Sequence, residues 1–222
     1  MWGSNYTFLA HVNYEGETIV AVYKPSRGER PLWDFPTASL ARREVAAYLV
    51  SEELGWDFVP PTILREKGPL GNGSLQLFVD HDPDYHYFNF SEEDRQRLRP
   101  VVLFDLLVNN ADRKGSHILK DPGEQLWLID HGVCFHLEDK LRTVVWDFVG
   151  EPIPEKLCAD ITFFCQRLKS PNRNPGDLID RLQNYLSRGE IRALIERAEY
   201  LVAAGSFPGP DPYRRPFPWP QV

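Results

Sequence analysis

The sequence has few cysteines and no long apolar run, and both absences narrow the class of protein. Its three cysteines, Cys134, Cys158 and Cys165, are scattered, and no C-x-x-C pair occurs. Such an odd set predicts reduced thiols rather than a disulfide framework, and it favours a cytoplasmic protein. No apolar stretch approaches the ~20 residues that a membrane-spanning helix requires. The first residues also lack the pattern of a signal peptide.

Positive charge is in deficit as well. The 222 residues include 25 Lys and Arg against 32 Asp and Glu, which gives a formal net charge of −7. An acidic chain is poorly suited to bind nucleic acid or an anionic membrane surface non-specifically, so we expect no nucleic-acid partner. With 42% hydrophobic residues, the chain is able to bury the core of one domain or of two small lobes. These properties leave the oligomeric state open.

Periodicity and turn residues predict an α+β protein whose strands come first. One helix is expected at residues 38–54, with Thr37 as its N-cap and Gly55 just after its last turn. Ser91 with Asp94 has the pattern of a second helix start. Strands are predicted at residues 6–12, 18–23, 63–66 and 74–79, and further helices at residues 92–99, 101–108, 157–168, 176–186 and 190–202.

This order of elements divides the chain into three parts. Residues 1–80 form a small β-rich N-lobe, and residues 81–206 form a mostly helical C-lobe, with a hinge near residues 80–84. Residues 207–222, FPGPDPYRRPFPWPQV, are rich in proline and aromatic residues. They predict an extended segment that is disordered or laid across the body.

A polar loop between two apolar segments is the strongest functional signal. The stretch NNADRKGSHIL, residues 109–119, follows VVLFDLLV and precedes WLIDHG. The second strand of the following hairpin ends near Asp130. If Lys120 pairs with Trp127 in this hairpin, His117 faces Asp130, with Cβ atoms ~4.5–5.5 Å apart.

Asp112 in the loop would then lie close to His117 and Asp130. Two carboxylates and an imidazole at short range favour a divalent cation between them. The alternative is a solvated turn with ordinary surface charges. That alternative is weaker because apolar sequence flanks the loop on both sides.

Three other features are candidates for phosphate binding or for support of the loop. Glu44 lies within the apolar stripe of its helix and needs a cationic partner, which Lys24 at the end of a strand is able to supply. The stretch GSN, Gly3, Ser4 and Asn5, lets backbone N–H groups approach a phosphate, or it is simply a flexible terminus. Asp105, in the apolar run, needs a partner such as Arg113, and we interpret it as structural.

The order of these parts resembles the protein-kinase-like fold, in particular its phosphatidylinositol 3-/4-kinase and HipA-type branch. There the catalytic loop reads D-R-x-x-x-N and a D-x-G follows, similar to ADRKGSH and IDHG here. The stretches GERPLWDFP, REVAAYLVSEELGW, NNADRKG and LIDHGVCFH resemble an uncharacterised, mainly actinobacterial family described as SCO1664-like or PI3/4-kinase-like. This narrower resemblance spans most of residues 3–150.

The resemblance implies an enzyme that transfers the γ-phosphoryl group of ATP with Mg²⁺ or Mn²⁺ to a hydroxyl of a protein, a small molecule or a lipid. Lys24, oriented by Glu44, would bind phosphates, with Gly3, Ser4 and Asn5 as the glycine loop. The backbone of Phe78, Val79 and Asp80 would hold the adenine edge. Asp112, followed by Arg113, would be catalytic, and Asp130 and His117 would hold the metal.

Several departures keep other functions open. His117 stands where the lipid-kinase loop has a metal-binding Asn, and the strand expected before Gly3 is missing. Both features favour a pseudokinase that acts as a nucleotide-binding or interaction module. An adenylyltransferase on the same fold is another alternative. A metal-dependent phosphoesterase built on Asp112, His117, Asp130 and His131 is a third, and it would not need Lys24 or Glu44.

Overall fold

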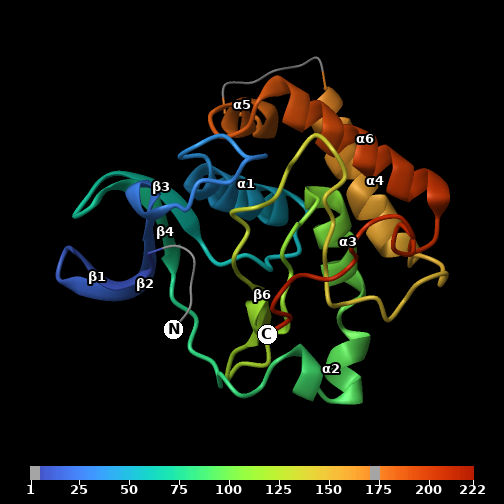
Figure 1. Cartoon of the computed structure of the whole chain (residues 1–222), viewed down its shortest axis with the longest axis horizontal. Helices are drawn as coiled ribbons and strands as arrows, with labels where there is room; N and C mark the ends of the chain where they lie inside the picture. Colours follow the sequence, from blue (N-terminus) through green and yellow to red (C-terminus); the bar gives the residue numbers. More distant parts are fainter. Residues whose placement is uncertain (1–5, 171–175) are drawn as a thin grey trace.

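A four-stranded antiparallel sheet forms the first part of the fold (Figure 1). The structure, a computed structural model, describes residues 6–170 and 176–222. The strand order is β1-β2-β4-β3. The strands are β1 (Phe8–Tyr14), β2 (Glu17–Pro25), β3 (Thr62–Gly68) and β4 (Gly71–Leu77).

The β1–β2 hairpin determines where Lys24 lies. Glu15 and Gly16 both have positive φ, 49° and 87°, which suits a two-residue hairpin turn. The strand β2 then pairs with β4, and Lys24 lies opposite Ser74. Pro25 ends the strand. Lys24 is therefore held at the end of a strand in the interior of the sheet.

The helix α1 (Leu40–Glu53) packs against β3 and β4. Its start differs from the prediction, because Ser39 and not Thr37 precedes the first turn and makes no side-chain cap. The carboxylate of Glu29 takes that role by accepting hydrogen bonds from the backbone N–H groups of Leu40 and Ala41, at 3.3 and 3.0 Å. At the other end, Gly55 has φ 65°, as the sequence predicted.

Helices are the main regular structure of the second part and lie mainly on one side of the molecule (Figure 1). The helices α4, α5 and α6 pack on one another, and α3 packs on α6. Buried side chains of α1, α3, α4 and α6 form one continuous core. The elements are α2 (Glu92–Gln96), α3 (Arg99–Val108), β5 (Ile118–Lys120), β6 (Leu126–Leu128), α4 (Glu155–Lys169), α5 (Leu178–Gln183) and α6 (Arg188–Ala204). The predicted α+β class is thus confirmed.

The β5–β6 hairpin is shifted by one residue from the predicted register. Leu119, and not Lys120, lies opposite Trp127. The reason is the turn, whose loop of residues 122–124 has an odd number of residues and is closed by a hydrogen bond from the Asp121 N–H to the Gln125 carbonyl, at 3.0 Å. Glu124 has φ 68°, as the last residue of such a three-residue loop requires.

The proline-rich C-terminal segment lies across the helical part and reaches the polar loop. The N–H of Thr143 donates to the Pro216 carbonyl at 3.0 Å, and the N–H of Gly115 donates to the Gln221 carbonyl at 2.8 Å. Of the two predicted states, the docked one is therefore observed. Among the helices of the described residues, none combines the length and the apolar character that crossing a membrane requires.

Candidate active site

Three charged side chains from distant parts of the chain meet at one point. The Lys24 ammonium donates to Glu44 Oε1 at 2.9 Å and also contacts Asp130 Oδ1. The second oxygen of Glu44 accepts the backbone N–H of His131 at 3.0 Å. A strand, a helix and the segment after β6 are thereby joined. The predicted pairing of Lys24 with Glu44 is present.

These contacts keep the cluster ionised. Burial alone would lower the pKa of Lys24, but the carboxylates of Asp130 and Glu44 raise it above its usual value. Burial would raise the pKa of Asp130, but Lys24 and His117 lower it well below the usual range. The Asp130 side chain is nevertheless 43% exposed. A charged carboxylate thus faces the open side of the site.

His117 lies against Asp130, as predicted, despite the shifted register. Its Nε2 is 3.1 Å from Asp130 Oδ2. Burial lowers the pKa of His117 to about 4 even though Asp130 opposes this, so the ring is neutral at pH 7. Its buried Nδ1 has no hydrogen-bond partner among the described residues. The ring proton therefore belongs on Nε2, the nitrogen that faces Asp130.

Asp112 is one of the partly exposed residues of the polar loop. Its N–H donates to Asn110 Oδ1 at 3.0 Å, which fixes the backbone. Burial raises the pKa of Asp112, and the Lys114 ammonium, 3.4 Å away, opposes that rise; Asp130 also raises it, so the two carboxylates lie within electrostatic reach. The sequence interpretation missed Lys114, although its place two residues after Asp112 was an available signal.

Arg113 lies behind the site rather than in it. Its side chain is fully buried and makes three hydrogen bonds of 3.0–3.1 Å to Asp105. It also donates to the carbonyls of His117 and Ile129, and its Nη2 is 2.7 Å from His131 Nε2. The proposed catalytic role for Arg113 therefore needs correction, because a side chain enclosed in this way positions the loop and does not reach a substrate. The structural interpretation of Asp105 agrees with these contacts.

The residues predicted to hold a nucleotide base have mixed surroundings. The N–H of Phe78 already donates to the Val20 carbonyl at 3.0 Å, and the Val79 carbonyl lies 2.9 Å from His81 Nδ1. Asp80, next in this connection, is exposed. The Phe78 N–H and the Val79 carbonyl thus already have polar partners within the protein. The predicted glycine loop, residues 3–5, lies outside the described residues.

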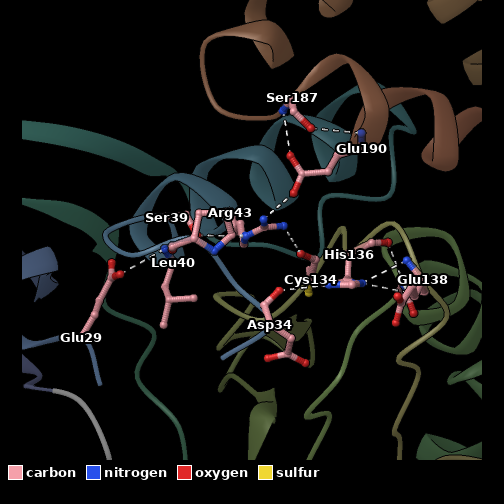
Figure 2. Close-up of polar contacts among 12 residues, drawn as sticks. Glu29, Asp34, Ser39, Leu40, Arg43, Cys134, His136, Glu138, Ser187 and Glu190 are labelled. Carbon is pink, nitrogen blue, oxygen red and sulfur yellow. Dashed lines mark hydrogen bonds and ion pairs between the residues drawn. The ribbon is translucent and has the colours of Figure 1, made fainter. Parts of the chain in front are cut away.

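Arg43, which the sequence interpretation also missed, connects α1 to the start of α6 and to the segment around Cys134 (Figure 2). It is 2% exposed, donates to the Cys134 carbonyl at 2.5 Å and forms an ion pair with Glu190. Glu190 is fixed by its reciprocal contacts with Ser187 at the start of α6. Because Glu44 is the next residue on α1, this connection helps to hold the carboxylate that orients Lys24.

The donor set fits a divalent cation that shares its ligands with a phosphate. In the described part of the chain, no three or more His, Cys, Asp or Glu side chains converge on one metal position. Mg²⁺ commonly binds one or two carboxylates, with the remaining positions filled by phosphate oxygens and water. Asp130, charged and part-exposed, meets that requirement. His117 fits less well, because a metal on Nε2 would displace its proton to Nδ1.

Comparisons with known proteins first define the class. Hydra Fam20, solved with a sugar, aligns with a TM-score of 0.53 at 15% identity, covering 91% of this chain and 81% of that one. The Helicobacter pylori proinflammatory kinase CtkA aligns with a TM-score of 0.52 at 12% identity, covering 93% and 90%. The fold is therefore kinase-like. No protein-family model matches the chain.

Sequence relatives define the family. The Mycobacterium tuberculosis (strain ATCC 25618 / H37Rv) protein Rv2133c is 40% identical in an alignment 252 positions long, which covers 98% of this chain and 88% of that protein. The chain belongs to the family of Rv2133c. Phosphatidylinositol 4-kinase gamma 4 of Oryza sativa subsp. japonica is 32% identical over 62% of this chain, which spans only 30% of that protein's length. The narrower assignments to SCO1664-like and HipA-type proteins stay predictions.

Proposed function

We propose that the chain is an ATP-dependent phosphotransferase that moves the γ-phosphoryl group of ATP to a hydroxyl of a protein, a small molecule or a lipid. The observation that carries this proposal is the contact of Lys24 with both Glu44 and Asp130. An acid–lysine–acid arrangement of this kind supports binding of a nucleotide's phosphates and metal at one place.

Each side chain then has a distinct task. Lys24, held by Glu44, binds phosphate oxygens. Asp112 aligns the acceptor hydroxyl and accepts its proton, a role that its raised pKa favours. Lys114 is close enough to Asp112 to share in that positioning. Asp130, against which His117 lies, would hold Mg²⁺ or Mn²⁺, which when bound neutralises phosphate charge.

Calorimetric titration with ATP tests the binding part of the proposal. Wild-type chain is titrated with Mg²⁺, with Mn²⁺ and with a chelator, beside Asp130→Ala and the control Glu66→Ala, an exposed carboxylate on β3. We expect metal-dependent binding that Asp130→Ala loses and Glu66→Ala keeps. Absence of binding under every condition would sink the enzyme proposal and leave an interaction module.

Labelled ATP separates the remaining alternatives. Transfer of a γ-label to an acceptor supports the kinase, whereas transfer of an α-label identifies an adenylyltransferase. ATP binding with no transfer favours the pseudokinase, an alternative that rests on His117 standing where the lipid-kinase loop has a metal-binding Asn. A phosphoesterase would remain active in Lys24→Ala, and the proposed enzyme would not.

A further inference from the structure

The two edges of the four-stranded sheet differ in how they are protected. The β3 edge carries the charges of Arg65, Glu66 and Lys67, and its pairing with β4 is irregular between Arg65 and Gly68. Charged residues and bulges are among the devices that keep an edge strand from pairing with another chain. The β3 edge is therefore protected against further strands.

The β1 edge has neither device. Its sequence, FLAHVNY, contains no Lys, Arg, Asp, Glu or Pro, and it pairs with β2 in regular register along its whole length. Within residues 6–170 and 176–222, no strand pairs with its outer side. The β1–β2 hairpin projects from the molecule, away from the helical part (Figure 1). An accessible and unprotected edge of this kind is a template for one more strand.

The hairpin register shows which backbone groups of β1 face outwards. In a two-residue hairpin the residues beside the turn, here Tyr14 and Glu17, exchange hydrogen bonds, and bonded pairs then recur at every second residue. The N–H of Phe78 donates to the Val20 carbonyl at 3.0 Å, which agrees with this alternation because it turns Val20 towards β4 and away from β1. The β1 residues whose N–H and C=O groups point outwards are Leu9, His11 and Asn13.

These outward groups match a second copy of the same strand in antiparallel orientation. When two copies pair about His11, this residue faces its own equivalent, and Leu9 faces Asn13 of the other copy. Every outward residue then meets an outward residue, and each such pair exchanges two backbone hydrogen bonds. Among the antiparallel registers, this one aligns the whole of Phe8–Tyr14 with itself.

The side chains match in the same register. Phe8 meets Tyr14 of the second copy, and Ala10 meets Val12, so an aromatic pair lies at each end of a small apolar centre. These are the non-bonded pairs of an antiparallel ladder, in which Cα atoms lie ~4.5 Å apart and side chains are in closest contact. In the single chain Tyr14 is 73% and Leu9 is 61% exposed. Pairing would cover apolar surface that β1 otherwise leaves in water.

Charges near the ends of β1 favour the same partner. Glu15 and Glu17 are exposed at the tip of the hairpin. Arg27 is exposed near the start of β1, where Gly28 lies against Tyr6. In the antiparallel arrangement the tip of each copy lies at the start of β1 of the other copy. Acidic and basic groups therefore approach one another at both ends of the contact, which favours association.

We propose that the chain forms a symmetric dimer through β1, in which the two sheets join into one continuous antiparallel sheet with His11 at the twofold axis. The contact uses the same surface of both copies, so it occupies both β1 edges, and the protected β3 edges end the assembly. Seven residues a side form an interface below the ~1,200 Å² that stable complexes bury. The dimer should therefore depend on protein concentration.

Sedimentation velocity of the full chain over a hundredfold range of concentration tests the dimer. We expect the mean sedimentation coefficient to rise from the monomer value to the dimer value and to rise no further. A monomer at every concentration would overturn the proposal. Growth beyond the dimer would overturn the closed, twofold arrangement.

A charge at the twofold axis should break the contact. His11→Lys places two ammonium groups opposite one another, and like charges at directly opposed positions are destabilising. The control Ile63→Lys adds the same charge on the β3 edge, where Ile63 is 55% exposed. We expect His11→Lys to weaken dimerisation at least tenfold and Ile63→Lys to behave like wild type. Equal loss in both variants, or loss in the control alone, would overturn the assignment to β1.

Cysteine crosslinking tests the orientation and the register. Leu9→Cys and Asn13→Cys are oxidised separately and as a mixture, beside wild type, because Cys158 is partly exposed. In the proposed register these two positions face one another with Cα atoms ~5.5 Å apart, a distance that a disulfide spans. We expect the mixture to form a crosslinked dimer and the separate variants to stay uncrosslinked. Crosslinking of each variant with itself would indicate a parallel partner and overturn the arrangement.

A melting curve controls for folding. His11 is exposed, so His11→Lys should melt like wild type at a concentration where wild type is monomeric. Dimerisation is measured without nucleotide, and its outcome therefore does not depend on the proposed phosphotransfer.

Discussion

The two faces of the polar loop differ more than their sequence suggests. Asp112 and Lys114 lie on the open face, and Arg113 between them is buried. The backbone is extended here, since the Arg113 N–H donates to Arg142 and its carbonyl accepts from Val144. Successive side chains of an extended segment point to opposite sides. One short stretch can thereby present reactive groups and anchor them at the same time.

The largest effect is expected when the buried face is broken. Arg113→Met leaves the Asp105 carboxylate buried without its cation, and the loss of such a partner costs about 3–5 kcal/mol of folding stability. Urea denaturation measures this cost. The double variant Asp105→Leu/Arg113→Met removes both charges and should regain part of the loss. A single variant within 1 kcal/mol of wild type would contradict the buried role.

A substitution on the open face should lower activity and leave folding stability nearly unchanged. Asp112→Asn removes the proton acceptor but keeps the side-chain shape, so phosphotransfer should fall by about 10²–10⁴-fold. Folding stability should stay within about 0.5 kcal/mol, as for most exposed sites. Initial rates with labelled ATP and a melting curve measure the two quantities. Full activity in this variant would remove Asp112 from the chemistry.

Acid should lower the folding stability of the protein through the buried ring of His117. Its pKa is about 4 in the folded protein and near 6.5 in the unfolded chain, so the unfolded chain binds the proton first. Its stabilising contribution is complete above pH 6.5 and is lost as the pH falls towards 4. The loss is about 2 kcal/mol at pH 5.

Denaturation curves at pH 7.5 and pH 5.0 isolate the contribution of His117 to folding stability. His117→Asn should show a smaller loss than wild type between these two pH values. The buried His131 has a pKa that is also lowered, so it remains as a shared background in both proteins. Identical losses in the two proteins would exclude His117 as the group responsible.

The smallest effect is expected from Lys114→Met. Lys114 is 3.4 Å from Asp112, and that carboxylate is 36% exposed, so solvent weakens the interaction. We expect about a tenfold lower transfer rate, equal to about 1.4 kcal/mol, and no change in stability. Rate measurements beside Lys156→Met, an exposed control on α4, test this. An equal change in both would assign it to overall charge.

Local chemistry explains why part of the fold was predictable. Gly55 after α1 and the Ser91 cap follow from short-range rules, and both are observed. The pairing of Lys24 with Glu44 followed because a carboxylate in an apolar stripe needs a cation. Asp105 and Arg113 followed by the same reasoning. In each case a few neighbouring residues, or one charged residue in an apolar stretch, were enough to predict the feature.

Other features depended on partners that the local sequence does not specify. The hairpin register changed because a loop of two residues and a loop of three cannot be told apart from DPGE alone. Glu29 caps α1 from eleven residues away, and the contact of Arg43 with Glu190 spans 147 residues. Only the tertiary arrangement brings such groups together. The catalytic and metal roles of Asp112 and Asp130 likewise stay predictions until they are measured.

The connection between Arg43 and Glu190 has a consequence for how the family diverges. A cation enclosed in a protein cannot be replaced alone without leaving its carboxylate unmatched, and the reverse is also true. Substitutions at these two positions should therefore occur together during evolution, despite their distance along the chain. A relative that has lost the basic residue should carry a neutral one at the start of its α6, and its α1 should be secured by other means.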